Sequence, residues 1–407
     1  MKENKELIKR RSFLKLGVTG LAGATVLPSA LGAKNLSHKV QEKNERKFIY
    51  RTLGKTGIRL PVVSMGVMNA DNPNLVAAAL DSGIVMLDTA WGYQRGNNEK
   101  MIGEVIENRP RDSFVIATKV PGMPRDRQTG LFSEETKGET FIEMFHTSLE
   151  RLGLDYVEIL YLHNVSRREA VLFEPLMEAL QKLKNQGKAK FIGITTHSNE
   201  PESIRAAVEA KIYDVVLTAY NFRKDYLTDL DKAIAEAAQA GLGIVAMKTQ
   251  AGVYWDKEKQ HPINMKAALK WALNNPNIHT AIPGFTTFDQ MELDLTVMED
   301  LTLTEEEKKD LIQGDDIHAG LYCQHCERCV PQCPGRLPIP SLMRGFMYAY
   351  GYRNLGAAHE LISSLKLPDN PCGSCSSCSV NCAFGFNVRE RIDDISRLKS
   401  IPADFFV

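Results

Sequence analysis

The stretch Val157-Glu158-Ile159-Leu160-Tyr161-Leu162-His163 is almost wholly apolar and ends on a polar residue. Seven further runs of this kind occur between residues 51 and 315, at 60–68, 84–90, 114–120, 191–197, 215–221, 243–248 and 280–285. Amphipathic helical patterns alternate with them, for example at 141–152, 174–185 and 227–240. Strands that are apolar on both faces are typical of a parallel sheet covered on both sides. Eight such β/α units predict a (β/α)8 TIM barrel.

A doubly wound open sheet is the rival architecture for the same alternation. The first apolar run is not followed by the G-x-G-x-x-G turn that dinucleotide-binding sheets of that kind carry. The chain has 407 residues, of which 50 are Lys or Arg and 50 are Asp or Glu. A formal net charge of zero gives no indication of nucleic-acid binding. The barrel is therefore the preferred prediction.

Polar residues stand where three consecutive predicted strands end. Asp88 closes the run at 84–90, Tyr93 lies in the loop that follows, and Lys119 and His163 close the next two runs. In TIM barrels the carboxyl ends of the strands carry the active site. Each residue alone has an ordinary explanation, such as a helix cap for Asp88 or a core hydrogen bond for His163. Their joint occurrence at neighbouring strand ends favours a catalytic site.

The segment Asp88-Thr89-Ala90-x-x-Tyr93, with Lys119 and His163, resembles the catalytic tetrad of the aldo/keto reductase family. The resemblance covers the barrel, about two thirds of the chain. It implies that Tyr93 is the general acid, supported by Lys119 and Asp88, and that His163 orients the carbonyl or relays a proton. A tyrosine has a pKa of about 10, and a neighbouring ammonium is expected to lower that pKa. The resemblance also implies an NAD(P) cofactor and a small carbonyl or alcohol substrate.

The segments that resemble the family's nicotinamide site differ from it in detail. Thr195 and Thr196 replace a Ser-Asn pair that holds the nicotinamide amide, and a threonine hydroxyl still forms hydrogen bonds. Leu217 stands at the position of an amide-binding glutamine and forms none. Met247, followed by Lys248, replaces an aromatic residue that stacks on the ring, and a thioether packs there more loosely.

The loop at 282–287 resembles the family's phosphate-binding loop and contributes Gly284 and Thr286. Gln290 aligns with an arginine that usually holds the 2′-phosphate, so NADPH loses its advantage over NADH. We expect NAD(P) binding without choosing between the two forms. A partly degraded nucleotide site is the alternative. The expected cofactor residues are Thr195, Thr196, Met247, Lys248, Gly284, Thr286 and Gln290.

All eight cysteines of the chain form two copies of the pattern C-x2-C-x2-C-x3-C. They are Cys323, Cys326, Cys329 and Cys333, followed by Cys372, Cys375, Cys378 and Cys382. The pattern resembles that of ferredoxins with two 4Fe–4S clusters, in which the fourth cysteine of each copy ligates the other cluster. That resemblance implies that Cys382 joins the first three cysteines and Cys333 joins the second three. Zinc sites usually split their ligands two and two, although zinc stays an alternative. Four disulfides would be an unusual need for a chain with 43% hydrophobic residues.

The amino terminus has the order of segments that is typical of an export signal. The basic stretch Lys9-Arg10-Arg11-Ser12-Phe13-Leu14-Lys15 precedes a small-residue and apolar run at 16–31. It resembles the twin-arginine signal, whose export route carries folded proteins and is therefore compatible with clusters inserted in the cytoplasm. Cleavage after Ala33 would place the protein in the periplasm or cell envelope. An uncleaved signal that anchors the chain to the membrane is the alternative.

Together these patterns predict an α/β fold class: a (β/α)8 TIM barrel followed by a small, mostly helical ferredoxin-like iron–sulfur domain. The predicted parts are a signal peptide (1–33), a linker (34–50), the barrel (51–315), the two-cluster domain (316–390) and a tail (391–407). The predicted function is an exported oxidoreductase that interconverts a carbonyl and an alcohol, with a sugar-like substrate suited to the cell envelope. The alternative is an electron-transfer protein whose barrel is a scaffold. Nicotinamide transfers two electrons together, whereas an iron–sulfur cluster transfers one at a time. The clusters would therefore either be structural or serve a separate electron-transfer partner. The further expected partner is the twin-arginine export machinery.

Overall fold

The computed structural model of the protein describes residues 46–406, apart from 127–128, 253–260, 313–322 and 324. The predicted signal peptide, including Arg10 and Arg11, and the linker up to residue 45 lie outside the described residues. Both assignments therefore stay predictions. Within the described ranges, no helix combines the length and the apolar character that crossing a membrane requires.

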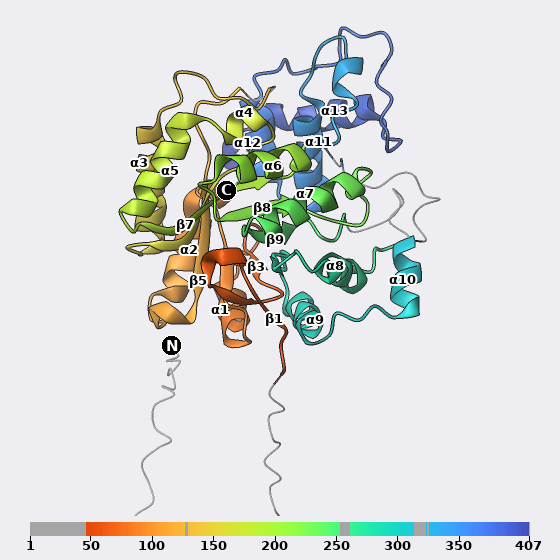
Figure 1. Ribbon diagram of the computed structural model, residues 1–407. Coiled ribbons are helices and arrows are strands. Elements are labelled where there is room, and N and C mark those ends of the chain that lie inside the picture. The colour runs from red at the N-terminus through yellow and green to blue at the C-terminus, as the bar shows by residue number, and fades with distance from the viewer. Residues whose placement is uncertain (1–45, 127–128, 253–260, 313–322, 324, 407) are drawn as a thin grey trace, which may run out of the picture. The chain divides into compact units, whose positions relative to one another are not determined.

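The predicted barrel is present (Figure 1). Eight parallel strands follow one another in chain order around one sheet, and a parallel bridge between Val63 and Ala281 joins its two ends. The strands are β3 (Met65–Gly66), β4 (Met86–Asp88), β5 (Val115–Val120), β6 (Val157–Leu162), β7 (Ala189–Thr196), β8 (Val215–Ala219), β9 (Gly243–Met247) and β10 (Thr280–Ala281). Every residue of β5, β6 and β8 is buried, as expected of strands covered on both faces. The doubly wound alternative is excluded.

Helices cover the outside of the barrel. They are α1 (Pro73–Asp81), α2 (Asn97–Ile106), α3 (Gly138–Leu152), α4 (Arg168–Val171), α5 (Glu174–Asn185), α6 (Glu200–Ala210), α7 (Leu227–Gln239), α8 (Met265–Asn274), α9 (Phe288–Glu299) and α10 (Glu305–Ile312). In α3 the buried residues Phe141, Phe145, Leu149 and Leu152 recur every three or four positions and form one stripe toward the strands. Their side chains belong to the large hydrophobic cluster between the helices and the sheet.

A short hairpin closes the amino-terminal end of the barrel. Strands β1 (Tyr50–Thr52) and β2 (Arg59–Pro61) pair antiparallel around the turn η1 (Gly54–Thr56). Leu53 and Leu60 are fully buried in the cluster that fills the barrel interior. A Cβ on Gly54 would lie 2.4 Å from the backbone nitrogen of Gly243, at the start of β9, so a larger residue does not fit there. The opposite end of the barrel is left for the functional loops.

The cysteine-rich region after the barrel is helical. Its elements are η4 (Val330–Gln332), α11 (Ile339–Phe346), the π-helical turn η5 (Met347–Gly351), α12 (Leu355–Ser364), α13 (Val388–Ser396), η6 (Arg397–Ser400) and η7 (Ala403–Phe406). They share a separate hydrophobic cluster that includes Leu342, Ile362, Ile392 and Ile395. The boundary predicted at residue 390 falls inside α13. The relation of this region to ferredoxins stays a prediction.

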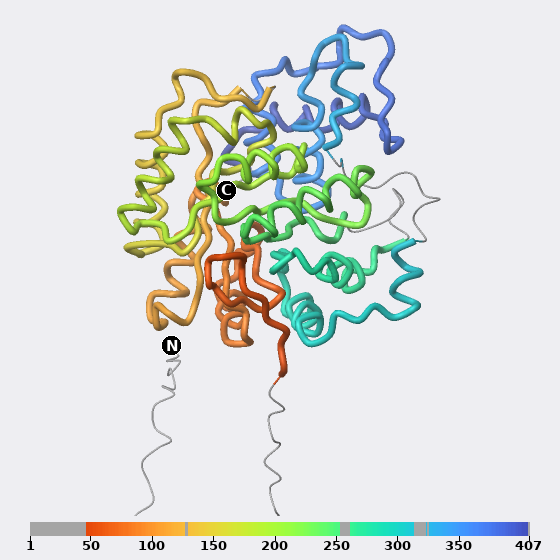
Figure 2. The backbone as a smooth tube through the Cα atoms, in the orientation of Figure 1, coloured from red at the N-terminus to blue at the C-terminus, as the bar shows by residue number. Residues whose placement is uncertain are grey.

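The cysteine-rich region, blue in Figure 2, contacts the segments that follow the carboxyl ends of β6, β7 and β8. Arg167 pairs with Glu327 at 2.8 Å, and Arg328 pairs with Asp225. The rings of His197 and His325 lie 5.6 Å apart. The cysteine-rich region therefore forms a roof over the end of the barrel that carries active sites in this architecture.

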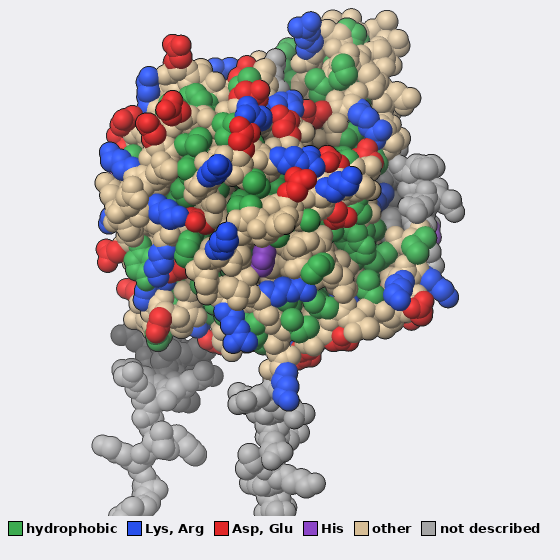
Figure 3. Space-filling model, viewed as in Figure 1, with side chains coloured by type: hydrophobic (Ala, Val, Ile, Leu, Met, Phe, Trp, Pro, Cys, Tyr) green, Lys and Arg blue, Asp and Glu red, His purple; other side chains and the backbone are tan. Residues whose placement is uncertain are grey.

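On the face of the molecule drawn in Figure 3, basic and acidic side chains are interspersed.

Candidate active site

The four predicted catalytic residues converge on one point at the carboxyl ends of three neighbouring strands. Asp88 ends β4, Lys119 lies near the end of β5, and His163 directly follows β6. Tyr93 begins the short turn η2 (Tyr93–Gly96). Because β4, β5 and β6 are adjacent and parallel, their carboxyl ends bring these side chains together.

Lys119 is the centre of the hydrogen-bond network. Its ammonium donates to the carboxylate of Asp88, to the backbone oxygen of Thr89 at 2.6 Å and to the hydroxyl of Tyr93 at 3.3 Å. The side chains of Asp88 and Lys119 are each only 2% exposed. The rings of Tyr93 and His163 meet edge to face, with their centroids 6.1 Å apart. The geometry is that of a phenol held between an ammonium and an imidazole.

Burial sets the protonation states of the two aromatic groups. It raises the pKa of Tyr93 well above 10, and the negative charge of Asp88 and the phenol of Tyr348 add to this rise. The sequence led us to expect a lowered pKa for Tyr93; desolvation of the phenolate outweighs the attraction of the Lys119 ammonium. Burial also lowers the pKa of His163 well below its usual value, assisted by the positive charges of Lys119, Arg125 and Arg344. At neutral pH the site therefore holds a protonated phenol and a neutral imidazole.

A guanidinium from the roof enters this end of the barrel. Arg344, in α11, lies with Nη2 3.2 Å from Nδ1 of His197. The side-chain amide of Asn164 is oriented so that both of its polar atoms have partners. The amide oxygen accepts from Arg344 Nη1 at 3.2 Å, and the amide nitrogen donates to His197 Nε2 at 2.9 Å. Among the described residues, Nε of Arg344 has no partner and no carboxylate pairs with this guanidinium. No sequence pattern pointed to Arg344.

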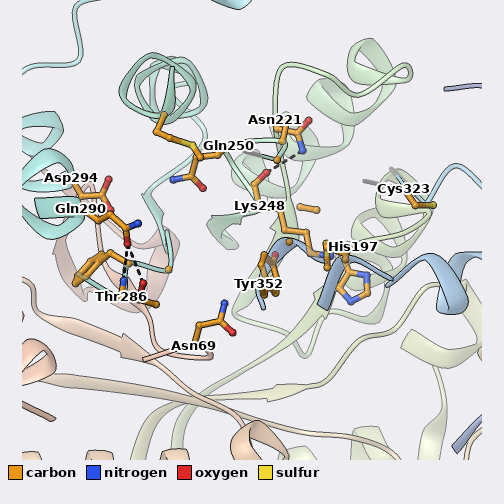
Figure 4. Close-up of a pocket in the computed structure, with 18 of the residues that line it drawn as sticks. Asn69, His197, Asn221, Lys248, Gln250, Thr286, Gln290, Asp294, Cys323 and Tyr352 are labelled. Atoms are coloured by element: carbon orange, nitrogen blue, oxygen red, sulfur yellow. Dashed lines mark hydrogen bonds between the residues drawn. The ribbon is translucent and has the colours of Figure 1, made fainter. Parts of the chain in front are cut away.

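Four of the seven predicted cofactor residues line one cavity of 340 Å³: Lys248, Gly284, Thr286 and Gln290. Figure 4 shows Thr286 and Gln290 at one end of this cavity and His197 and Cys323 at the other. The side-chain oxygen of Gln290 accepts from the backbone nitrogen of Thr286 at 2.8 Å. We call this cavity the nucleotide cleft.

The other three predicted cofactor residues do not line the nucleotide cleft. The hydroxyl of Thr195 accepts from the backbone nitrogen of Asn164 at 2.7 Å, and that of Thr196 donates to the backbone oxygen of Ser198 at 3.1 Å. Met247 packs against the cluster that fills the barrel interior. In this conformation the two hydroxyls hold loop backbone, and their roles toward a cofactor stay predictions. Leu217, which was not expected to bind, is fully buried in the same interior cluster.

Two groups in the nucleotide cleft fit a ligand that carries phosphate and amide groups. Lys248 has a left-handed backbone with φ of 56°, and no described carboxylate pairs with its ammonium. Burial lowers the pKa of Lys248 to about 7, assisted by the positive charges of Arg344 and Lys224. The side-chain oxygen of Asn69, which also lines the cleft, is buried and has no hydrogen-bond donor in the described part of the chain. A cation and an unsatisfied acceptor are thus available to a bound cofactor.

A second cavity, of 470 Å³, adjoins the tetrad and is lined by Tyr93, His163 and residues of the roof. We call it the tetrad cavity. Of the described residues, none lines both cavities. The segment 344–352 accounts for the separation: Met347, Gly351 and Tyr352 face the nucleotide cleft, whereas Tyr348 faces the tetrad cavity.

None of the eight cysteines, all of which lie in the described ranges, forms a disulfide. Burial, with contributions from the nearby charges of Cys326 and Cys382, raises the pKa of Cys323 to about 11. Burial likewise raises the pKa of Cys372 to about 11, with contributions from Cys378, Cys375 and Cys333. Cys329 also interacts with Cys323, Cys326 and Cys382. Cys382 is thus within electrostatic range of the first three cysteines, and Cys333 of Cys372 in the second copy. In the described ranges, no three Cys, His, Asp or Glu side chains converge on the position of a single metal ion.

This fold and this tetrad define an oxidoreductase built on a TIM barrel. The model of the aldo/keto reductase family matches residues 64–267, about half of the chain, and the protein belongs to this family. The match ends before β10 and before the cysteine-rich region. Aldo/keto reductases use a nicotinamide cofactor, NAD(P)H.

Known relatives agree with this assignment. L-galactose dehydrogenase of Arabidopsis thaliana is 28% identical over 297 residues, which cover 63% of this chain and 89% of the relative. D-threo-aldose 1-dehydrogenase of a Pseudomonas species is 28% identical over 222 residues, 47% of this chain and 66% of the relative. The holo form of aldo-keto reductase AKR11C1 from Bacillus halodurans shares the fold, with a TM-score of 0.54 and 21% identity over 69% of this chain and 99% of that one.

Proposed function

We propose that this protein interconverts a carbonyl and an alcohol with NAD(P), using Tyr93 as general acid or base. The observation that carries the proposal is the position of Lys119, whose ammonium lies 3.3 Å from the Tyr93 hydroxyl and also binds Asp88. An ammonium at this distance stabilises the phenolate that forms when Tyr93 gives up its proton. Asp88 holds the ammonium in place. His163 is beside the phenol on the other side.

The chain's own residues manage the proton in this scheme. In the reducing direction, hydride addition turns the carbonyl oxygen into an alkoxide, and the protonated Tyr93 delivers its proton to that oxygen. The transfer is favourable because an alkoxide is a stronger base than the phenolate of Tyr93 that is left. The neutral imidazole of His163 donates a hydrogen bond to the same oxygen and orients it. In the oxidising direction the Tyr93 phenolate removes the proton of the alcohol. When bound, NAD(P) supplies or accepts the hydride.

The cofactor is proposed to bind in the nucleotide cleft. Lys248 would contact its phosphates, and the loop with Gly284 and Thr286 would hold the adenosine end near Gln290. Gln290 offers a neutral amide in place of a guanidinium, so neither NADH nor NADPH is favoured by charge.

A sugar-like substrate is proposed on two grounds. Two of the relatives are named for dehydrogenation of L-galactose and of D-threo-aldoses. The tetrad cavity carries the polar side chains of Gln94, Asn97 and Asn354 in addition to the catalytic pair. Such groups suit hydroxyls better than an aromatic or aliphatic substrate.

Two 4Fe–4S clusters are proposed in the cysteine-rich region. The support is the ferredoxin-like spacing, together with the electrostatic proximity of Cys382 to the first copy and of Cys333 to Cys372, which suits the crossed pairing of such ferredoxins. Each iron of such a cluster takes one thiolate, so its ligands need not converge on one ion. Cys378 is exposed, and an electron-transfer partner would approach the second group there. Export through the twin-arginine route is proposed from Arg10 and Arg11.

A second function remains: electron transfer, with the barrel as a scaffold. The observation in its favour is that Cys323 lines the nucleotide cleft, whereas the tetrad cavity is separate. A ligand in the cleft is therefore adjacent to the first cysteine group instead of to Tyr93. This arrangement would suit a protein that moves electrons without using its tetrad.

Anaerobic purification followed by iron, sulfide and zinc analysis, with a nucleotide titration on the same sample, tests these assignments. We expect about eight irons per chain and saturable NAD(P) binding. Cys326→Ser should remove one cluster and leave the other. Redox-active clusters without nucleotide binding would favour the electron-transfer protein, and a colourless, zinc-loaded, folded protein would contradict the clusters. Changing Arg10 and Arg11 to Lys should retain the protein in the cytoplasm, which fractionation measures.

A further inference from the structure

The outer wall of the tetrad cavity comes from the cysteine-rich region, beyond the part of the chain that matches the family. Tyr348, Asn354 and Glu360 line the cavity opposite Tyr93 and His163. Tyr348 lies in η5, Asn354 caps α12, and Glu360 lies within α12. The family match covers residues 64–267 only, so these side chains are a property of this chain and its roof.

The π-helical turn η5 places Tyr348 next to the tetrad. Tyr348 is close enough to Tyr93 to contribute to the raised pKa of that phenol. Burial raises the pKa of Tyr348, which the positive charge of Arg344 lowers and the negative charge of Glu360 raises. Its ring stacks on Tyr352, with the centroids 5.9 Å apart, which holds it in this position. Short π-helical turns often occur at functional sites.

The wall presents hydrogen-bonding groups that the protein itself leaves unused. The side-chain oxygen of Asn354 accepts from the backbone nitrogen of Ala357 at 2.9 Å, and its amide nitrogen donates to no described residue. Glu360 is exposed and forms no ion pair with any described cation; Arg95, on the barrel side, likewise pairs with no described carboxylate. One cavity therefore holds an acceptor, a donor and two phenols.

We propose that Tyr348, Asn354 and Glu360 contact the substrate and give this enzyme its preference for polyhydroxylated carbonyl compounds. The inference rests on the proposed function, because the cavity is a substrate site only if Tyr93 exchanges the proton. A carboxylate accepts from two neighbouring hydroxyls, while an amide and a phenol donate to others. A site built to hydrogen-bond hydroxyls discriminates strongly against ligands that lack them. Arg95 lines the same cavity as Glu360 and balances its charge, so a neutral polyol chain fits better than an acidic one.

Steady-state kinetics of Glu360→Leu, with D-xylose and benzaldehyde as the two carbonyl probes, test this. For D-xylose we expect kcat/KM to fall on the order of tenfold, from the loss of one or two hydroxyl contacts. For benzaldehyde we expect no loss. Tyr348→Phe keeps the stack on Tyr352 and should reduce the D-xylose value more than the benzaldehyde value. Glu390→Leu, an exposed glutamate in α13, is the matched control and should change neither value. Equal losses for the two aldehydes, or no loss for D-xylose, would overturn the inference.

A binding experiment separates this inference from the proposed function. D-xylose is titrated into the cluster-loaded protein without turnover, by calorimetry, for the unmodified chain and for Glu360→Leu. Saturable D-xylose binding that weakens in Glu360→Leu supports the inference. If Tyr93→Phe nevertheless leaves turnover unchanged, only the proposed role of Tyr93 is contradicted. Absence of saturable D-xylose binding to the unmodified chain would overturn the inference.

Discussion

The tetrad cavity and the nucleotide cleft both lie under the roof, but the interactions that position their functional residues come from different parts of the chain. The hydrogen bonds of the tetrad lie within the barrel, from Lys119 to Asp88 and to the backbone oxygen of Thr89, directly after β4. The nucleotide cleft depends on both regions, because Cys323, His325 and Tyr352 of the roof line it together with Lys248. The hydrogen bonds of the tetrad thus lie within the family's barrel, whereas the cavity proposed for the cofactor is lined by the barrel and the cysteine-rich region together. Substitutions in the two cavities should accordingly have separable effects.

The largest effect is expected for Tyr93→Phe. It removes the hydroxyl and keeps the ring, so turnover should fall by ~10²–10⁴-fold, equivalent to about 3–5 kcal/mol in the barrier. Nucleotide affinity should stay nearly constant, because Tyr93 does not line the nucleotide cleft. Single-turnover kinetics and a nucleotide titration measure the two quantities. A Phe variant with full activity on the natural substrate would show that the tetrad is not the catalytic machinery.

Lys119→Met should cost a similar factor in turnover, because the phenolate of Tyr93 loses its stabilising charge. The double variant with Tyr93→Phe should be little worse than either single one, since the two residues act as a unit. The substitution also leaves Asp88 buried without its partner, which raises the pKa of that carboxyl further and destabilises the fold by about 3–5 kcal/mol. Thermal unfolding is therefore measured in parallel, and Asp88→Asn with Lys119→Met is the control for the buried charge. Additive losses in turnover would argue against a coupled tetrad.

Whether a residue of these two cavities could be predicted from the sequence depends on how far apart in the chain the contacting residues lie. The tetrad could be predicted because each member sits at a strand end, and strand order alone brings such ends together. Arg344 could not, because it meets His197 across 147 residues of chain and no spacing rule connects them. Thr195 and Thr196 were found by position in a family segment, but position does not determine which way a hydroxyl turns. The barrel followed from hydrophobic periodicity, whereas the roof was predicted only as mostly helical because its cysteine spacing specifies ligands and not helices.

Arg344→Ala tests whether the roof separates the two cavities. The guanidinium binds His197, which lines the nucleotide cleft, and Asn164, which follows the tetrad residue His163. Hydride transfer requires reacting atoms to approach within about 3–3.5 Å. We infer that a nicotinamide reaching the tetrad from the cleft displaces this group and breaks its hydrogen bonds. We expect nucleotide affinity to rise roughly tenfold, or about 1.4 kcal/mol, in the variant. The exposed Arg397→Ala is the matched control from the same region. Weaker nucleotide binding by Arg344→Ala would mean that the guanidinium contacts the cofactor.

The smallest effect is a pH dependence of nucleotide binding through Lys248. Burial together with Arg344 and Lys224 lowers the pKa of this lysine to about 7, so it is an ammonium below that pH and a neutral amine above it. The phosphates of the cofactor prefer the ammonium. Affinity should therefore fall about fivefold, close to 1 kcal/mol, as the pH rises from below to above the pKa of Lys248. Fluorescence titrations across this range measure it, and Lys232→Met, at an exposed position in α7, should leave the dependence intact.

Two variants sharpen this last prediction. Lys248→Met should bind weakly at every pH and lose the dependence, because the titrating group is gone. Arg344→Ala should keep the dependence but move its midpoint to higher pH, because removing a neighbouring positive charge lets the pKa of Lys248 rise toward its ordinary value. Arg344→Ala should thus have two effects. It should raise nucleotide affinity by removing the barrier between the cavities, and it should shift the midpoint of the pH dependence by removing a positive charge. A midpoint that does not move would show that Arg344 and Lys248 do not interact in the protein, and the roof would then influence the nucleotide cleft by shape alone.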